Sequence, residues 1–419
     1  MPSTRAAPTA SSLPPFAAPR LSIVVLPFVN LSNDPDQQYF ADGSTEDLTT
    51  DLSRIADMFV ISRGTAFSYR NRPVSAKQIR EELRVRYVLE GSVRRSGNRV
   101  RVNAQLVDTD SSAQLWAERF DQSAGDLLTL QDEITGRIAV ALNLELISME
   151  AARRVERPGA LDYIFRGRAA SRKPQSPDNY EETVSFFDRA LALDPRSVEA
   201  QSRLAIALTA RVLDQMTSSK AADIARAEAL VGQALDAAPR SPVAHFAKGQ
   251  LLRVEKRYAE AIPEYEMAIT FDRSWVNALD PLAECKLFVG VIDAVIPLNQ
   301  QAIRLSPRDP FIAIWYFRIG VAHLLRSRIN DAIVWLEKAR GINPEFPYVH
   351  SHLASAYALR GEIERSGVEL AEARRLSLDG RYSSLAHLQA TAYYGVPKIH
   401  ALYEDTYFAG LRKAGMPEE

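Results

Sequence analysis

The chain contains 419 residues, of which 46% are apolar and 25% are charged. This composition is ordinary for a globular protein, but the chain is too long for one compact core, so we expect two or more packing units. Because 51 basic residues almost balance 52 acidic ones, no global field draws the protein to nucleic acid or to anionic lipid. No stretch approaches the roughly 18 uninterrupted apolar residues that a membrane-spanning helix needs, which excludes an integral membrane protein.

The single cysteine, Cys285, excludes an internal disulfide and lies in an apolar helical pattern. We expect a small buried side chain without reactivity, in a reducing compartment. The sequence therefore predicts a soluble, cytoplasmic protein, and periplasmic residence stays open as the alternative.

Residues 1–20 are interrupted by five prolines, which break any apolar helix that could serve as a signal sequence. We expect a flexible tail or linker there. From Leu21 the pattern changes to a β-branched apolar run that ends near Pro27, and such a run predicts a buried strand.

The next hundred or so residues alternate between helical and strand patterns. Ser44–Asp47 resembles a helix cap, and it precedes apolar residues at helical spacing. The clearest strand signal is a hairpin, in which residues 87–93 and 100–106 alternate apolar and polar side chains on either side of a tight turn. Further expected elements are a strand at 58–62, a helix at 75–83, a strand at 115–120 and a closing helix at 127–146.

Several ordered blocks of this segment carry a family resemblance. The blocks are Val25–Ser32, Tyr39–Gly43, Thr45–Leu48, Val85–Val93, Gly97–Val100 and Leu115–Asp121. Together they resemble the TolB-amino-terminal-like domain. In bacterial signalling chains that domain commonly follows a class III adenylate cyclase or a winged-helix DNA-binding domain and precedes tetratricopeptide repeats. The resemblance implies a small regulatory α/β domain over residues 21–150, and it names no ligand.

After Glu150 the strand signals disappear and a pattern of small, aromatic, small and proline residues recurs. The units end at Pro195, Pro239, Arg273, Pro307, Pro344 and Leu378, which are separated by 44, 34, 34, 37 and 34 residues. The tetratricopeptide period is 34, so residues 160–381 resemble about six such units. Small residues let paired helices approach, and an aromatic residue fills the space between neighbours.

We also expect insertions near residues 213–219 and 311, and capping helices at 382–419. The predicted fold class is thus a small mixed α/β N-terminal domain followed by an all-α tetratricopeptide solenoid.

A search for catalytic and cofactor motifs finds none. The glycines form neither a dinucleotide fingerprint nor a phosphate-binding loop, and no histidine is followed by glutamate as a zinc helix requires. His350 and His352 are two residues apart and so lie on different helix faces, which favours packing roles over metal binding. The sequence predicts no catalytic residue, no cofactor and no metal.

An acidic segment follows the first predicted strand. Its members are Asp34, Asp36, Asp42, Glu46 and Asp47. Turn formation and favourable charge at a helix N-terminus explain them best. Because α/β domains often bind ligands beyond the carboxyl ends of their strands, a small-molecule site there stays open.

Residues 63–101 are the most basic part of the chain, with 11 basic residues and 3 acidic ones. Arg80 and Arg84 occupy the polar side of a predicted helix, and Arg99 and Arg101 the polar side of a predicted strand. A solvated or docking face is favoured over a nucleic-acid surface. The same arginines could instead receive an acidic partner domain.

Binding a protein partner is the default function of a solenoid, because its first helices line a concave groove. Helical spacing selects Phe246, Gln250 and Arg253 in one unit as groove candidates. The next unit contributes Asn277, Asp280 and Glu284. We therefore predict a non-catalytic signalling scaffold whose partner could be a cyclase or regulator domain. Two alternatives stay open: the regulatory portion of a split or truncated adenylate cyclase, or of a transcription regulator that lacks its DNA-binding domain.

Overall fold

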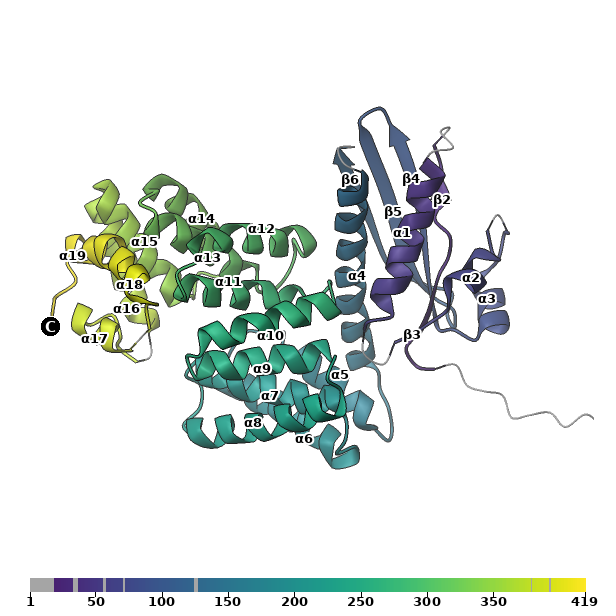
Figure 1. Cartoon of the computed structure of the whole chain (residues 1–419), viewed down its shortest axis with the longest axis horizontal. Helices are drawn as coiled ribbons and strands as arrows, with labels where there is room; N and C mark the ends of the chain where they lie inside the picture. The colour runs from purple at the N-terminus through teal and green to yellow at the C-terminus, as the bar shows by residue number, and fades with distance from the viewer. Residues whose placement is uncertain are drawn as a thin grey trace, which may run out of the picture. The chain divides into compact units, whose positions relative to one another are not determined.

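A computed structural model describes residues 19–32, 37–55, 58–70, 72–123, 127–377, 379–391 and 393–419 (Figure 1). The chain divides into two compact units, Met1–Ile138 and Ala139–Glu419, and each is described by itself. The described residues confirm the predicted fold class, a small mixed α/β domain followed by helical repeats. Residues 1–18, expected to be a flexible tail, and Leu378, expected to end the sixth repeat, lie outside the described residues.

The first unit contains a mixed sheet with the strand order β3-β1-β4-β5-β6. The strands are β1 (Ser22–Val25), β2 (Val29–Asn30), β3 (Phe59–Val60), β4 (Tyr87–Ser96), β5 (Arg99–Asp108) and β6 (Gln114–Ser123). β1 runs parallel to β3 and β4, short β2 also pairs with β4, and β4, β5 and β6 are antiparallel. The predicted hairpin is confirmed, with Val93 opposite Val102 and Leu89 opposite Leu106. Gly97 has a φ of +56°, which the tight turn requires and which glycine adopts readily.

Two long helices pack on one face of this sheet, and two short helices cover part of the other. α1 (Gln37–Leu52) packs on β1 and β4, and α4 (Leu127–Ala152) contacts β6 through the guanidinium of Arg137, which lies 4.8 Å from the Phe120 ring. A Cβ at Gly91 would lie 2.3 Å from the Phe28 ring, so only glycine lets that ring pack against β4. On the second face, α2 (Arg63–Phe67) and α3 (Ala76–Leu83) form a smaller apolar cluster with Val24 and Val88.

The expected helix cap at Ser44–Asp47 is wrong, because α1 begins at Gln37 and places these residues in its interior. The Thr45 hydroxyl donates to the carbonyl of Ala41 at 2.9 Å and accepts from the amide of Phe28 at 3.0 Å. A side chain that resembles a local cap thus connects the helix to the chain just beyond β1.

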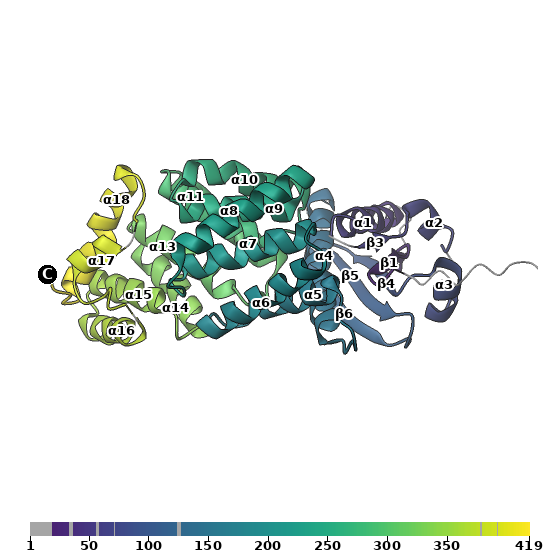
Figure 2. The ribbon, with the colours of Figure 1, turned by 90° about the horizontal axis from the view of Figure 1, so that it is seen from below.

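The second unit consists of stacked antiparallel helix pairs, and six pairs lie within its described residues (Figure 2). They are α5 (Ala160–Ala170) with α6 (Pro177–Leu193), α7 (Val198–Leu213) with α8 (Lys220–Ala237), α9 (Pro242–Val254) with α10 (Tyr258–Phe271), α11 (Leu279–Phe288) with α12 (Val295–Leu305), α13 (Ile312–Leu325) with α14 (Ile329–Ile342), and α15 (Pro347–Arg360) with α16 (Ile363–Leu376). The pair α11 and α12 is preceded and joined by the short 3₁₀ turns Val276–Ala278 and Ile292–Ala294.

Small residues in the first helix of a pair let a large side chain of the second helix approach. A Cβ at Gly249 would lie 2.7 Å from the Tyr265 ring, and a Cβ at Gly320 would lie 2.7 Å from Leu336. Cys285 is buried, as predicted, and burial raises the pKa of its thiol to about 12.

Two buried histidines join the first helix of their pair to the second helix of the same pair and to the turn that precedes the pair. In α9, Nδ1 of His245 lies 2.6 Å from a carboxylate oxygen of Glu264, and its Nε2 lies 2.9 Å from the carbonyl oxygen of Pro239. His350 in α15 repeats this arrangement with Glu369 and the carbonyl of Pro344, at 2.6 and 2.7 Å. Both ring nitrogens therefore face acceptors, which only the doubly protonated imidazolium satisfies.

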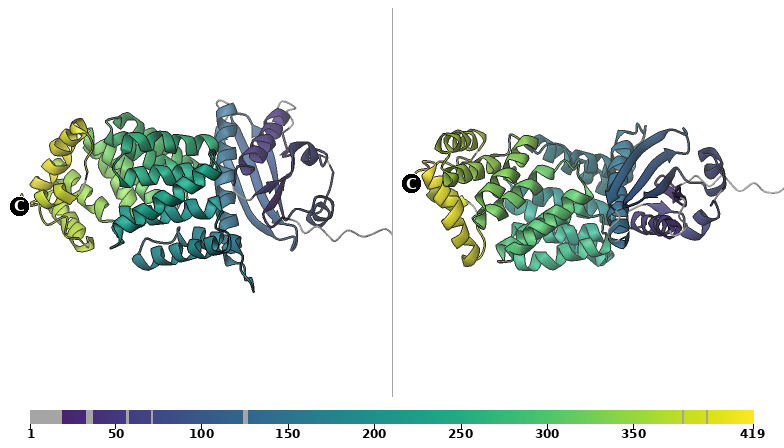
Figure 3. Two further views of the ribbon diagram at one scale, coloured as in Figure 1. Left: turned by 60° about the horizontal axis from the view of Figure 1, so that its bottom comes forward. Right: turned by 90° about the horizontal axis from the view of Figure 1, so that it is seen from above.

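The C-terminal helices cover the last pair of the array (Figure 3). They are α17 (Leu385–Thr391), α18 (Pro397–Tyr403), a π-helical turn (Glu404–Phe408) and α19 (Ala409–Lys413). The Tyr407 ring stacks on His352 of α15 at 4.1 Å between centroids, and Gly410 lies against the backbone of Ser355. Burial lowers the pKa of His352 to about 3, so its imidazole is neutral and serves packing.

Candidate functional site

The inner helices of the second unit enclose a cavity of about 260 Å³. Its walls come from α5, α6, α7, α9, α11 and α13, from the segment between α5 and α6, from the segments before α11 and α13, and from Ile147 near the end of α4. The cavity therefore draws on five consecutive helix pairs.

Contacts between the first and fifth pairs narrow this space. The Arg172 guanidinium, after α5, lies 3.3 Å from the carboxylate of Asp309 and 5.9 Å from the Phe311 ring centre, both just before α13. Val140 of α4 packs in one apolar cluster with Ile312 and Trp315 of α13. Where the first and fifth helix pairs meet, the concave side of the repeats therefore forms a partly enclosed cavity.

The structure places five of the six predicted groove residues along this cavity. Phe246, Gln250 and Arg253 come from α9, Asn277 from the 3₁₀ turn before α11, and Asp280 from α11. The sixth, Glu284, lies one helical turn after Asp280 and forms an ion pair with Arg253 at 2.5 Å.

These charged candidates pair with one another in a buried network. Besides Arg253, Glu284 contacts the Arg318 guanidinium of α13 at 2.7 Å, and Arg318 also lies 3.2 Å from Asp280. Burial opposes the ionisation of Glu284, but the two guanidinium groups outweigh it and lower its pKa to about 2. For Asp280 burial prevails, helped by the charge of Glu284, and raises the pKa above its ordinary value. The network fixes three consecutive inner helices to one another.

The other basic side chains of the cavity wall also have carboxylate partners. The pairs are Arg168 with Glu199 at 3.8 Å, Arg203 with Glu199 at 2.9 Å, Arg172 with Asp309 at 3.3 Å and Lys173 with Glu182 at 2.6 Å. Glu199 is shared by two of these arginines; with Asp214, Asp280 and Glu284 included, six carboxylates stand beside six basic side chains, so the charged groups around the cavity balance in number.

Sequence reasoning missed several residues of the cavity. Trp275 and Phe311 stand in the segments before inner helices, outside the repeated helix positions. Trp315 and Arg318 belong to α13, a helix for which no groove residue is predicted above. The same helical spacing applied to residues 312–325 could have found the last two.

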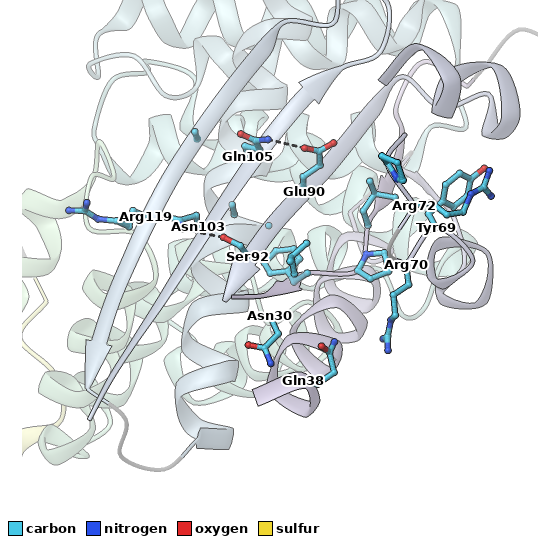
Figure 4. Close-up of a pocket in the computed structure, with 18 of the residues that line it drawn as sticks. Asn30, Gln38, Tyr69, Arg70, Arg72, Glu90, Ser92, Asn103, Gln105 and Arg119 are labelled. Carbon is cyan, nitrogen blue, oxygen red and sulfur yellow. Dashed lines mark hydrogen bonds between the residues drawn. The ribbon is translucent and has the colours of Figure 1, made fainter. Parts of the chain in front are cut away.

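A second hollow of about 980 Å³ lies on the partly covered face of the sheet in the first unit (Figure 4). Its floor is polar: Gln105 donates to Glu90 at 2.8 Å, and Asn103 donates to Ser92 at 3.2 Å. The residues after α2, including Arg70 and Arg72, form one side. The hydrogen bonds of the floor satisfy these side chains among themselves.

The predicted basic face is spread along the β4–β5 hairpin. Arg80 forms an ion pair with Asp110, and Arg84 ends α3 with a left-handed φ of 52°, both near the first residue of β4. Arg99 and Arg101 lie at the opposite end, a strand length of about 30 Å away at 3.3 Å per residue. Arg101 pairs with Asp121 at 2.6 Å. The structure thus places the four arginines at two separate ends of the hairpin.

The acidic residues of the first domain take structural partners. Asp42 accepts from Arg70 at 2.5 Å and from Gln38 at 2.7 Å, and Glu46 pairs with Arg63 at 3.2 Å. Asp34 and Asp36 lie outside the described residues. Within the described ranges, no group of three or more histidine, cysteine or acidic side chains is placed to hold a metal ion.

Comparison with known families identifies two parts of the chain. The sequence model of the family described as HilA/YgeH-like transcriptional regulator, second domain, matches residues 19–137. A tetratricopeptide repeat model matches residues 219–277. The helical array contains tetratricopeptide repeats. Since the N-terminal match names another family, the resemblance to the TolB-amino-terminal-like domain stays a prediction.

One curated relative is "Putative adenylate cyclase 3" of Rhizobium meliloti (strain 1021), which is 38% identical over 256 residues. The alignment covers 60% of this chain and 43% of the relative, so this chain spans less than half of that protein's length.

Similar solved structures include YrrB, described as a TPR protein with an unusual peptide-binding site, at 17% identity and a TM-score of 0.34, covering 49% of this chain and 97% of YrrB. Another is pilF of Pseudomonas aeruginosa, at 16% identity and a TM-score of 0.40, covering 56% of this chain and 97% of that one.

In the part of the chain that the structure describes, no helix is both long enough and apolar enough to cross a membrane.

Proposed function

We propose that this chain is a non-catalytic signalling and regulatory scaffold, located in the cytoplasm, that binds a protein partner on the concave side of its tetratricopeptide repeats. The observation that carries the proposal is the cavity of the inner helices, where half-buried Trp275 and Phe311 stand beside arginines that are held by carboxylates. Aromatic and arginine side chains in a partly desolvated pocket are typical of the anchor regions of protein interfaces.

The test is selection of peptides from a random phage-displayed library by the whole chain. Ala210 of α7 lines the cavity, so Ala210→Trp fills it. The matched control is Ala237→Trp, at an exposed position of α8. Peptides enriched by the wild type and by the Ala237→Trp variant, but lost with Ala210→Trp, support the proposal. Equal enrichment by the two variants, or none by the wild type, overturns it.

A second candidate function is the regulatory portion of an adenylate cyclase whose catalytic part lies outside this chain. The relative named as an adenylate cyclase supports it, because 60% of this chain aligns with only 43% of that protein. The chain alone should form no cyclic AMP from ATP under this proposal and under the scaffold proposal. Cyclic AMP formed by the purified chain would overturn both.

A third candidate is the regulatory portion of a transcription regulator that lacks its DNA-binding domain. The match of residues 19–137 to a domain of HilA/YgeH-like regulators supports it. The α/β domain would then serve docking or sensing, as the TolB-like resemblance also suggests. Under this candidate the chain alone binds DNA weakly. Tight, salt-sensitive binding to a defined DNA sequence would show instead that the chain itself reads DNA.

A further inference from the structure

We infer that the cavity of the repeat array takes one neutral aromatic side chain with a polar atom, that of a tryptophan or a tyrosine, from a partner polypeptide. This inference rests on the proposed function and names the chemistry of its anchor. Three observations carry it: the size and walls of the cavity, its charge balance, and buried polar atoms without partners.

The size and the walls favour a single aromatic group. Small-molecule pockets usually measure about 300 to 1,000 Å³, so a cavity of about 260 Å³ accepts one large side chain but no folded segment. The Phe246 and Trp275 rings lie 5.8 Å apart between centroids and form one wall, while Phe311 stands at the Arg172 contact. Offset and edge-to-face contacts between rings stabilise an aromatic guest beyond simple burial.

The charges of the wall favour a neutral guest. The cavity is lined by six basic side chains, and each has a carboxylate within 4 Å. An anionic ligand would have to compete with these existing ion pairs. The guanidinium of Arg203 also lies 5.0 Å from the Trp275 ring centre, which holds that ring in place through a cation–π contact.

Polar atoms left without partners define what the guest must offer. Among the described residues, Nε1 of Trp275, the hydroxyl of Thr183 and Oδ1 of Asn179 are buried without a hydrogen-bond partner, and all three residues line the cavity. Thr183 is only 1% exposed. A buried polar atom without a partner is costly, so a ligand that supplies one binds more tightly. The indole N–H or the phenol O–H, with the adjoining peptide group, supplies both donors and acceptors, whereas the phenylalanine side chain supplies neither.

The experiment uses N-acetyl-5-fluorotryptophanamide as the probe, because its indole N–H donates and its amide carbonyls accept, and it follows the fluorine NMR relaxation of the probe with the whole chain. Trp275→Phe keeps an aromatic ring but removes the N–H, and Thr183→Val removes the hydroxyl at nearly constant volume. The matched control is Trp335→Phe in α14, since Trp335 packs on Tyr316 and does not line the cavity. We expect about five- to tenfold weaker binding for each cavity variant and no change for the control. N-acetyl-tryptophanamide and N-acetyl-tyrosinamide should displace the probe more strongly than the phenylalanine and leucine analogues do.

Equal binding by Trp275→Phe and Trp335→Phe, with unchanged melting temperatures, overturns the inference. So does displacement by the leucine analogue that matches displacement by the tryptophan one. The peptide selection separates this failure from that of the proposed function. If selected peptides depend on the cavity but share no tryptophan or tyrosine, the anchor is wrong and the scaffold function stands. If no peptide is selected, both fall.

Discussion

The two buried histidine–glutamate pairs predict a loss of stability as pH rises above 6.5. The hydrogen bond that Nδ1 of His245 donates to Glu264 raises the pKa of His245, and burial opposes this effect only in part. For His350 burial lowers the pKa, but the bonds to Glu369 and to the carbonyl of Pro344 outweigh that effect, so its pKa is also raised. A raised folded pKa means that the stabilisation is complete below the unfolded value of about 6.5 and is lost as pH rises through the folded value.

The magnitude follows from proton linkage. Each histidine that holds one more proton when folded than when unfolded lowers the free energy of unfolding by at most about 1.4 kcal/mol per pH unit. The two histidines together therefore lower it by at most about 2.8 kcal/mol per pH unit. The neutral His352 titrates in the opposite sense, but only below the unfolded pKa of about 6.5. Of these three histidines, only His245 and His350, whose pKa values are raised, should therefore change the stability between pH 6.5 and 9.

The test replaces both histidines by glutamine, because the second helix pair already uses glutamine at this position. Nε2 of Gln201 in α7 donates to the carbonyl of Pro195 at 2.9 Å. His245→Gln with His350→Gln should therefore retain the carbonyl contact and lose the titration. Urea unfolding of the chain, followed by circular dichroism at several pH values from 6.5 to 9, gives the free energy of unfolding. In the double variant this free energy should decline less steeply with pH than in the wild type. His387→Gln at an exposed site should follow the wild type. A decline of equal slope in the double variant would refute the reasoning.

Three further predictions concern the core of the array. Glu284→Gln leaves two buried guanidinium groups short of a charged partner and should lower the free energy of unfolding by about 3 to 5 kcal/mol in chemical denaturation. Gly249→Ala places a Cβ 2.7 Å from the Tyr265 ring and should lower the free energy of unfolding by about 1 to 3 kcal/mol. Its control is Gly232→Ala on α8, where the added Cβ meets no atom within 4 Å; this variant should raise the melting temperature. Cys285, with its raised thiol pKa, should react with a thiol reagent at pH 8 only after unfolding, and fast labelling of the folded chain would contradict its burial.

The elements predicted best from sequence are those whose side chains repeat with a fixed period. The β4–β5 hairpin follows from strict alternation, and its register places Val93 opposite Val102 as the pattern requires. The tetratricopeptide period follows from small residues such as Gly249, which must face a large side chain of the next helix. In both cases the packing partner lies nearby in the sequence, so a local pattern contains the information.

Prediction failed where a side chain bonds to a distant segment. The hydroxyl of Thr45 resembles that of a helix cap, yet it accepts from the amide of Phe28, 17 residues away. The closure of the cavity by Arg172 and Asp309 joins residues 137 positions apart. Such a contact depends on the path of five helix pairs, and the spacing of residues within one pair does not specify it.

The buried charges explain why the cavity is expected to be preformed. Arg253, Glu284, Arg318 and Asp280 belong to three consecutive inner helices, so sliding one helix past another would leave a desolvated charge without its partner. The helices that carry these charges also carry Phe246 and Trp315 of the cavity wall, which keeps the aromatic surface in register with the network. A partner then meets walls that need no rearrangement, and the ordering cost of binding falls mainly on the partner. Selection among partners should therefore depend on the shape of one side chain and on its hydrogen bonds, while changes in salt concentration should have little effect because the charges are already paired.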